Sequence, residues 1–193
     1  MGERNNQSVK KMVLGAILCA LVIVLQLMGQ FIHFGPFSIS LVLLPIVLGA
    51  ALCGPLTAAF LGGVFGMVVL FQPDTAAFMG ISVFGTVVTV LVKGILCGLA
   101  AGLVYRVFAK KNVYLATLLA AIVCPVVNTG VFLLGCLVFF LETISSWGVA
   151  GGFVSTAEYL LVGMVGLNFV VELAFNVVLT PVIVRLLNLR KRD

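Results

Sequence analysis

The sequence predicts an all-α integral membrane protein, a six-transmembrane-helix bundle with both termini in the cytoplasm. Three observations predict this class: the composition, the length of the apolar runs and the distribution of basic residues. Hydrophobic residues make up 63% of the 193 residues and charged residues 9%, whereas soluble domains have roughly 45–50% and 25%. A soluble fold of this length could not bury so much apolar surface. The chain is therefore expected in a lipid bilayer, and its long apolar runs indicate helices.

Six apolar segments follow one another along the chain. We expect the helices at approximately 11–31, 40–52, 56–71, 84–108, 114–141 and 159–187. Turn signals separate them: HFGPFS, CGP, QPDTAAFMG, AKKN and SSWGVAGG. The second segment is short and contains Pro45, and the last two exceed the ~20 residues that a bilayer requires, so they tilt, kink or protrude. The first run is long for a signal peptide and no small-x-small cleavage site follows it, so we interpret it as a retained helix. With no soluble domain, linker or convincing repeat, residues 1–193 are expected to form a single transmembrane domain.

The basic residues predict the orientation. Ten of the eleven Lys and Arg residues fall on one side of a chain that crosses six times, and the loops of the other side carry none. Cytoplasmic loops carry the excess of basic residues in membrane proteins, so both termini are expected in the cytoplasm. Topology thereby explains the net charge of +5. Nucleic-acid binding is not expected, because the basic residues flank spans and form no patch interleaved with aromatic residues.

Several kinds of chemistry are disfavoured by what the sequence contains. The five cysteines lie in or beside apolar runs without a C-x-x-C pair, and we interpret them as small packing residues. His33 is the only histidine, so a haem or zinc site and a general acid–base site have little support, and neither a metal nor a cofactor is expected. The chain also lacks a P-loop, so any ATP-driven work requires a partner.

Lys93 stands out because it interrupts an apolar segment. If its helix begins near Phe84, Lys93 lies ~14 Å inward, about the middle of a ~30 Å hydrocarbon core. A charge at that depth costs at least ~2.5–3.5 kcal/mol, so it must face a cavity or a counter-charge. Thr86, Thr89 and Lys93 form one polar stripe. Gly94 begins a separate row of glycines at every fourth residue, which suits close helix packing.

Other spans place polar residues at a similar depth. Asn128 lies in the fifth segment, and Asn168, Glu172 and Asn176 recur every four residues in the sixth. Helices four, five and six are therefore expected to direct polar side chains toward one cavity. A structural alternative is that Lys93 and Glu172 neutralise each other while the asparagines hydrogen-bond between helices. For Glu172 this packing or pairing role is favoured; for Lys93, contact with a ligand is favoured.

Five stretches together resemble a known family, the S components of energy-coupling factor (ECF) vitamin transporters, over nearly the whole chain. The first helix carries an A-x-x-x-A motif, Ala16 and Ala20 in GAILCALVIV. LLPIVLGAALCGPLTAAFLGGVFG is similar to helices two and three of the family, and VKGILCGLAAGLVYR resembles a helix-four segment that often begins with Lys or Arg. VVNTGVFLLG and NFVVELAFNVVLTPVIVRLL are similar to helices five and six of the branch that includes pantothenate transporters.

The resemblance implies a multi-pass subunit of a prokaryotic plasma membrane that binds a vitamin or related micronutrient with high affinity. In the family, ATP is hydrolysed by partners, namely a coupling membrane protein and two cytoplasmic ATPases, so the chain itself is not expected to be an enzyme. The resemblance implies docking through Ala16 and Ala20 and substrate contacts from Lys93, Asn128 and Asn168, with Phe34 and Trp147 contributing from the outer segments. Thr89 and Glu172 complete the candidate substrate site. Pantothenate or another small carboxylate-bearing vitamin is the expected substrate.

Two other classes of function remain open on the sequence. A stand-alone secondary transporter or channel would use acidic residues near the outer mouth as ion sites, with Asp74, Glu142 and Glu158 as the candidates. Transport in a strain without the ATPase module would support that class. A membrane enzyme is disfavoured, because the chain shows no constellation of nucleophile and base or of metal ligands.

Overall fold

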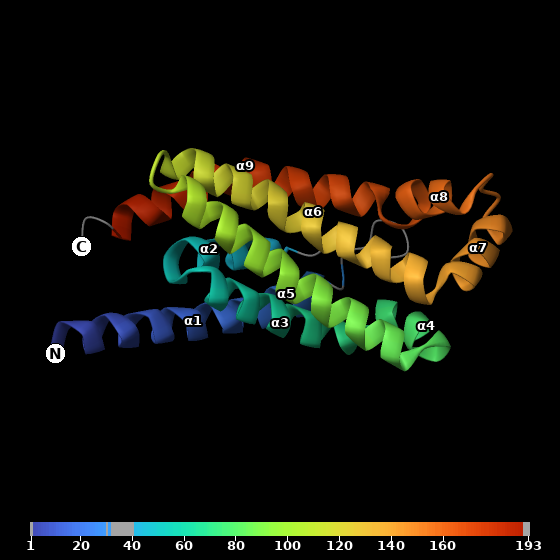
Figure 1. Ribbon diagram of the computed structural model, residues 1–193, viewed down its shortest axis with the longest axis horizontal. Coiled ribbons are helices and arrows are strands. Elements are labelled where there is room, and N and C mark those ends of the chain that lie inside the picture. Colours follow the sequence, from blue (N-terminus) through green and yellow to red (C-terminus); the bar gives the residue numbers. More distant parts are fainter. Residues whose placement is uncertain (1, 30, 32–40, 191–193) are drawn as a thin grey trace.

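The computed structural model describes residues 2–29, 31 and 41–190. Within these residues the chain is helical throughout, with the helices side by side along the long axis of the molecule (Figure 1). The elements are α1 (Gly2–Gly29), α2 (Leu43–Cys53), α3 (Pro55–Leu70), α4 (Pro73–Ile81), α5 (Val83–Phe108), α6 (Val113–Phe139), α7 (Leu141–Ala150), α8 (Thr156–Glu158), the π-helix η1 (Tyr159–Met164) and α9 (Gly166–Arg190). The prediction of an all-α protein is confirmed.

Four segments are long and apolar enough to cross a membrane: Val9–Gly29, Val83–Phe108, Val113–Phe139 and Gly166–Leu189. A fifth span results if α3 and α4, which meet at a bend of 79°, are counted together. The second expected segment corresponds to α2, which has 11 residues and is only ~16 Å long at 1.5 Å per residue. Residues 32–40, which precede it, lie outside the described part, so six crossings stay a prediction.

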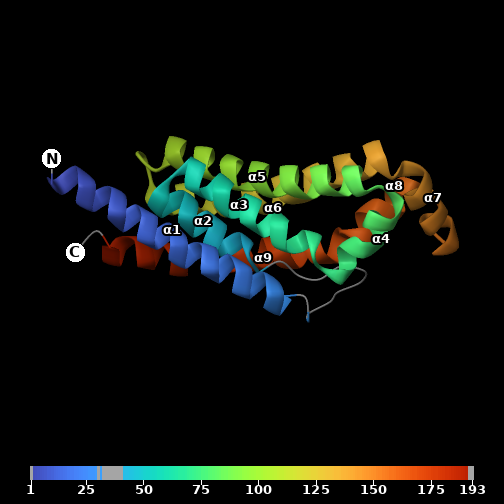
Figure 2. The same ribbon diagram turned by 90° about the horizontal axis from the view of Figure 1, so that it is seen from below.

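The helix α2 is mostly buried, including Leu43, Ile46 and Val47. It lies among the other helices (Figures 1 and 2). Gly54, with a φ of 101°, separates it from α3. Only glycine adopts this conformation readily, and Pro55 is well suited to the first position of the next helix. The sequence signal CGP therefore marks a tight connection between two helices, as predicted.

Two connections expected from turn signals are instead helical. The segment QPDTAAFMG forms most of α4, because Pro73 occupies the first turn of the helix and Asp74 complements its N-terminal dipole. Most of SSWGVAGG belongs to α7, so the expected fifth helix stops at Phe139 and a new helix begins at Leu141. The expected sixth helix begins as η1 and continues as α9. At these positions proline begins a short helix and small polar residues continue one, instead of forming loops.

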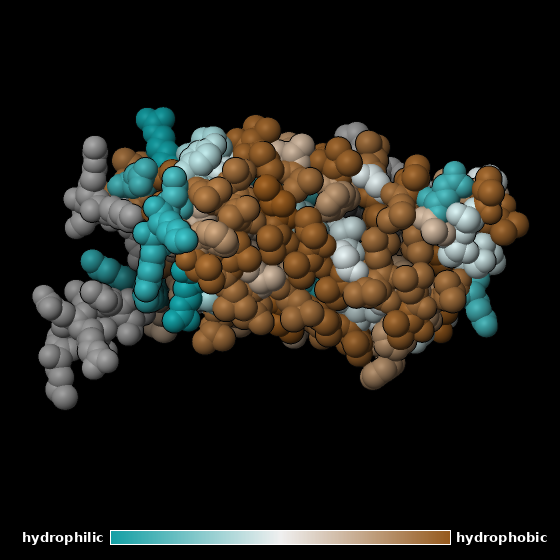
Figure 3. Space-filling view, turned by 45° about the horizontal axis from the view of Figure 1, so that its top comes forward, coloured by the Kyte–Doolittle hydropathy of each residue, from teal (hydrophilic) through white to brown (hydrophobic). Residues whose placement is uncertain are grey.

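The two ends of the molecule differ in character. The start of α1, the end of α9 and the connection between α5 and α6 lie together at one end, and α4, α7 and α8 lie at the other (Figure 1). In the space-filling view a broad hydrophobic belt separates hydrophilic residues at the two ends (Figure 3). A bilayer would cover this belt. Many large apolar side chains of the helices are exposed, among them Phe60, Met67 and Val178.

The interior contains two apolar clusters. The larger joins α1, α2, α3, α5, α6 and α9 and includes Phe65 and Ile46. The smaller lies toward α4 and α7 and includes Phe78, Phe140 and Ile144. The cavity described below opens between these clusters.

Candidate functional site

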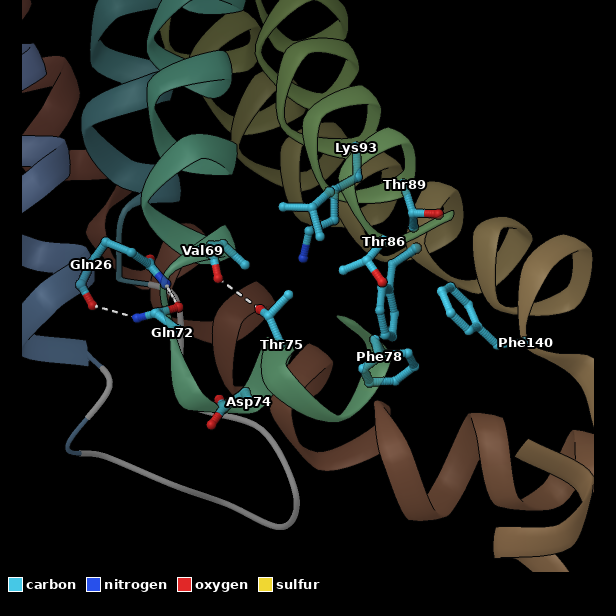
Figure 4. A pocket seen from close by; sticks show the side chains of 12 residues that line it. Gln26, Val69, Gln72, Asp74, Thr75, Phe78, Thr86, Thr89, Lys93 and Phe140 are labelled. Atoms are coloured by element: carbon cyan, nitrogen blue, oxygen red, sulfur yellow. Dashed lines mark hydrogen bonds between the residues drawn. The ribbon is translucent and has the colours of Figure 1, made fainter. Parts of the chain in front are cut away.

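A cavity lies where α1, α3, α4, α5 and α6 approach one another (Figure 4). Its interior has a volume of about 90 Å³, and the space between its walls is about 590 Å³ when the open mouth is included. The wall is formed by Gln26, Val69, Gln72, Asp74, Thr75, Phe78, Thr86, Thr89, Val90, Lys93, Phe132 and Phe140.

Lys93 brings a positive charge into this wall. Its Nζ lies 5.7 Å from the centroid of the Phe65 ring and 5.1 Å from that of Phe132. Phe65 belongs to the larger apolar cluster, and Phe132 packs against the smaller one. Both distances are within the range of cation–π attraction, so the two rings hold the ammonium group between the clusters.

The packing of α5 against α3 fixes the depth of Lys93. A Cβ atom on the adjacent Gly94 would overlap the carbonyl oxygen of Gly62, and one on Gly98 would overlap that of Ala58. These glycines allow the two backbones to touch, as the row of small residues in the sequence predicts. Because main-chain atoms cannot move aside as a flexible side chain can, the contact sets the register of α5.

Two threonines lie on the same side of α5 as Lys93, and both line the cavity. Thr86 Oγ1 donates a hydrogen bond to the carbonyl oxygen of Ser82, at 2.7 Å. Thr89 is buried, but its Oγ1 has no hydrogen-bond partner within the described part of the chain. The Thr89 hydroxyl is buried against Gly135 of α6, whereas that of Thr86 already has a partner.

The bend between α3 and α4 closes the cavity on another side. Thr75 Oγ1 donates to the carbonyl oxygen of Val69 at 2.7 Å, which holds the first turn of α4 against the end of α3. Gln72, between the two helices, exchanges hydrogen bonds with Gln26 of α1. The wall is thus built from segments that are far apart in the sequence.

Aromatic side chains form the end of the cavity near α7. Phe78 of α4 makes edge-to-face contacts with Phe132, Phe140 and Trp147, at centroid distances of 6.0, 5.2 and 5.7 Å. Such contacts favour fixed ring orientations. Phe78 therefore ties α4 to α6 and α7 and gives the cavity an apolar surface opposite its polar groups.

The residues expected at a substrate site do not all meet. Lys93 and Thr89 line the cavity, while Trp147 reaches it only through its contact with Phe78. Phe34 lies outside the described residues.

Asn128, Asn168 and Glu172 are buried but are not part of the cavity wall. For Asn168 and Glu172 the reason is the position of α9, which packs along α6 and contacts α2 rather than α5. The carboxylate of Glu172 nevertheless lies within electrostatic reach of Lys93. The sequence predicted that α5, α6 and α9 would meet at one cavity. In the structure α5 and α6 meet there with α1, α3 and α4, and α9 does not take part.

Sequence reasoning missed most of the cavity wall, including Gln26, Gln72, Thr75, Phe78 and Phe140. The sequence contained one signal. Gln26 and Gln72 are amide residues near the ends of two apolar segments, and polar residues in membrane spans are candidates for a functional role. The aromatic residues gave no such signal, because phenylalanine is common throughout this chain.

The expected docking residues lie on the outside. Ala16 and Ala20 are both exposed on α1, one turn apart. Their small side chains leave a shallow strip between larger exposed residues such as Met12 and Ile23. In the described residues, no group of three or more His, Cys, Asp and Glu side chains lies close enough to hold a metal ion.

The comparisons with known proteins agree with this architecture. Residues 10–184 match the family described as "ECF transporter, substrate-specific component". The chain is also similar to the pantothenic acid transporter PanT of Lactococcus lactis subsp. cremoris, with 30% identity over 188 residues that cover 88% of this chain and 89% of that protein. No solved structure matches the chain. The chain is a multi-pass membrane protein that belongs to the substrate-specific components of ECF transporters, which bind substrate and are not enzymes.

Proposed function

We propose that this substrate-specific component captures pantothenate, or another small vitamin with a carboxylate group, in the cavity beside Lys93. The observation that carries the proposal is a lysine held in the wall of an otherwise mostly uncharged cavity inside the hydrophobic belt. An ammonium group there favours an anionic ligand, because a charge-assisted hydrogen bond is stronger where water is scarce. The similarity to a pantothenic acid transporter supports the same class of substrate.

The Thr89 hydroxyl complements Lys93. Thr89 lines the same cavity, and its Oγ1 is buried against Gly135 without a partner in the described residues, so we propose that the hydroxyl turns toward the cavity and donates to the second oxygen of a carboxylate. A carboxylate has about four lone-pair sites and is poorly satisfied by one cation alone. We assign Asn128, Asn168 and Glu172 to the support of this wall, since they are buried and do not line the cavity.

We also propose that the chain docks through Ala16 and Ala20 on a coupling membrane protein, which two cytoplasmic ATPases drive. Both alanines are exposed on one face of α1, where another helix can approach closely. The termini are proposed to lie in the cytoplasm. Basic residues near the start of α1 and in the connection between α5 and α6, which contains Lys110 and Lys111, support this. The start of α1, that connection and the end of α9 lie at one end of the molecule (Figure 1).

Mass spectrometry of the ligand carried by the purified protein tests the substrate. Pantothenate, or another small carboxylate, in stoichiometric amount is the expected result, and a neutral or cationic ligand would contradict the proposal. Uptake of radiolabelled pantothenate in cells with and without the coupling module tests the energy source. Uptake is expected only with the module, and uptake without it would indicate a stand-alone transporter.

A further inference from the structure

Two buried glutamines join α1 to the bend between α3 and α4. Gln26 is 1% exposed and Gln72 is 4% exposed. Gln26 Nε2 donates to Gln72 Oε1 at 2.8 Å, and Gln72 Nε2 donates to the carbonyl oxygen of Gln26 at 3.1 Å. Both residues line the cavity that contains Lys93 (Figure 4).

The two hydrogen bonds determine which way each amide points. A main-chain carbonyl can only accept, so the NH₂ group of Gln72 must face it. The side-chain oxygen of Gln72 then accepts from the NH₂ group of Gln26. Gln26 Oε1 is left on the other side of its amide, and within the described residues it has no hydrogen-bond partner.

An acceptor that is buried without a partner is costly, and native structures contain few of them. In this protein the atom belongs to a residue that lines the cavity, so a ligand that reaches the buried oxygen can supply the missing donor. An amide oxygen accepts only, and it therefore favours a hydroxyl or N–H group and disfavours the oxygens of a carboxylate.

We propose that Gln26 is a specificity-determining residue whose Oε1 accepts a hydrogen bond from a neutral O–H or N–H group of the ligand, with Gln72 holding it in place. The inference rests on the proposed function, because it concerns the same cavity. It narrows the substrate to small carboxylates that also carry a separate neutral donor. Pantothenate fits this description through its hydroxyl groups and its amide.

The experiment compares ligands with and without donors on two proteins, the wild type and Gln26→Met. Methionine keeps the length of the side chain and removes the acceptor. The probes are pantothenate with analogues that lack one hydroxyl or carry an N-methylated amide, and biotin with its N-methylated derivatives. Affinities are measured by calorimetric titration of the purified full-length chain, with thermal melts of the ligand-free proteins as a control for folding.

Whichever of pantothenate and biotin binds is the parent compound. Its analogue without the donor that contacts Gln26 is expected to bind the wild type about tenfold more weakly, because one hydrogen bond to a buried acceptor is lost. Gln26→Met should bind the parent and the donor-less analogue equally. A merely structural role would weaken both compounds by the same factor and leave their ratio unchanged, which would overturn the inference. If Gln26→Met fails to fold, the wild type alone still tests the inference. Equal affinity of the wild type for every analogue and its parent compound would overturn the inference.

The outcomes separate the two proposals. If pantothenate fails to bind but biotin binds with the expected dependence on Gln26, pantothenate is excluded and the inference stands. If pantothenate binds with no dependence on its donors or on Gln26, the substrate stands and the inference is wrong. Failure of both parents to bind would overturn the inference, because it commits to small carboxylates with a neutral donor.

Discussion

The ammonium group of Lys93 on α5 lies 5.1 Å from the centroid of the Phe132 ring on α6. This contact positions the positive charge at the cavity. The face of the ring attracts the ammonium group and so replaces part of the stabilisation that water would give it. The ring also packs edge-to-face on Phe78, at 6.0 Å, so its orientation is held from the α4 side. The cation therefore lies between two helices and is positioned by an aromatic cluster that the sequence did not reveal.

Phe132→Leu should weaken ligand binding without destroying the fold. Leucine keeps an apolar side chain but removes the ring face, so Lys93 loses an attraction of about 0.5–2 kcal/mol and becomes less well positioned. We expect the affinity for pantothenate to fall roughly two- to tenfold. Calorimetric titration measures this. Leu134→Val, at a 62% exposed position on the lipid-facing side of the same helix, is the matched control and should bind as the wild type does.

Gly94→Ala should destabilise the protein. The new Cβ would overlap the carbonyl oxygen of Gly62, and α3 and α5 would have to separate. Such overpacking typically costs about 1–3 kcal/mol. A Cβ on Gly130 in α6 meets nothing within 4 Å, so Gly130→Ala should leave the melting temperature unchanged or raise it. Thermal unfolding in detergent compares the two, and equal melting temperatures would show that α3 and α5 are not in backbone contact.

Ala20→Trp should abolish docking and spare ligand binding. A bulky side chain would hold another helix away from the exposed strip on α1. Leu21→Trp is the control, because Leu21 is 40% exposed and successive helical residues point about 100° apart. Co-purification with the coupling module and titration with pantothenate are the two measurements. Loss of ligand binding with docking retained would mean that this face of α1 has been assigned the wrong role.

The C-terminus should lie in the cytoplasm. The basic residues near the start of α1 and in the connection between α5 and α6 gather at the end of the molecule where α9 ends (Figure 1), and such clusters are retained on the cytoplasmic side. Reporter fusions at Asp193, or labelling of a cysteine placed there, test the orientation. Labelling from outside intact cells would refute both the orientation and the proposed contact with cytoplasmic ATPases.

The fold was largely predictable because its signals are local. Long apolar runs predict α1, α5, α6 and α9, and the glycines that begin at Gly94 predict a close helix contact, which the structure places between α5 and α3. The short helices α4 and α7 were missed, because Pro73 and the small residues around Ser146 begin or continue helices here although they usually indicate turns.

The site was predictable only in part. Lys93 and Thr89 were found because a charge and a hydroxyl are conspicuous in an apolar helix. Gln26 and Gln72 were not, because their meeting depends on how α1 packs against the bend that follows α3, and that is a tertiary relationship. Glu172 was expected at a depth comparable to that of Lys93, but it belongs to a helix that packs on α6. Depth along a helix does not determine which faces meet.

The most direct test of the central claim is calorimetric titration of the wild type and Lys93→Met with pantothenate and with pantothenol, in which an alcohol replaces the carboxylate. Methionine keeps an unbranched apolar side chain and removes the charge. A charge-assisted hydrogen bond contributes roughly 1.5–3 kcal/mol, so Lys93→Met should bind pantothenate about ten- to a hundredfold more weakly. Pantothenol should bind both proteins alike, and the melting temperature without ligand should be kept or raised. Unchanged affinity for pantothenate together with a much lower melting temperature would contradict the account, because Lys93 would then be a structural counter-ion to Glu172.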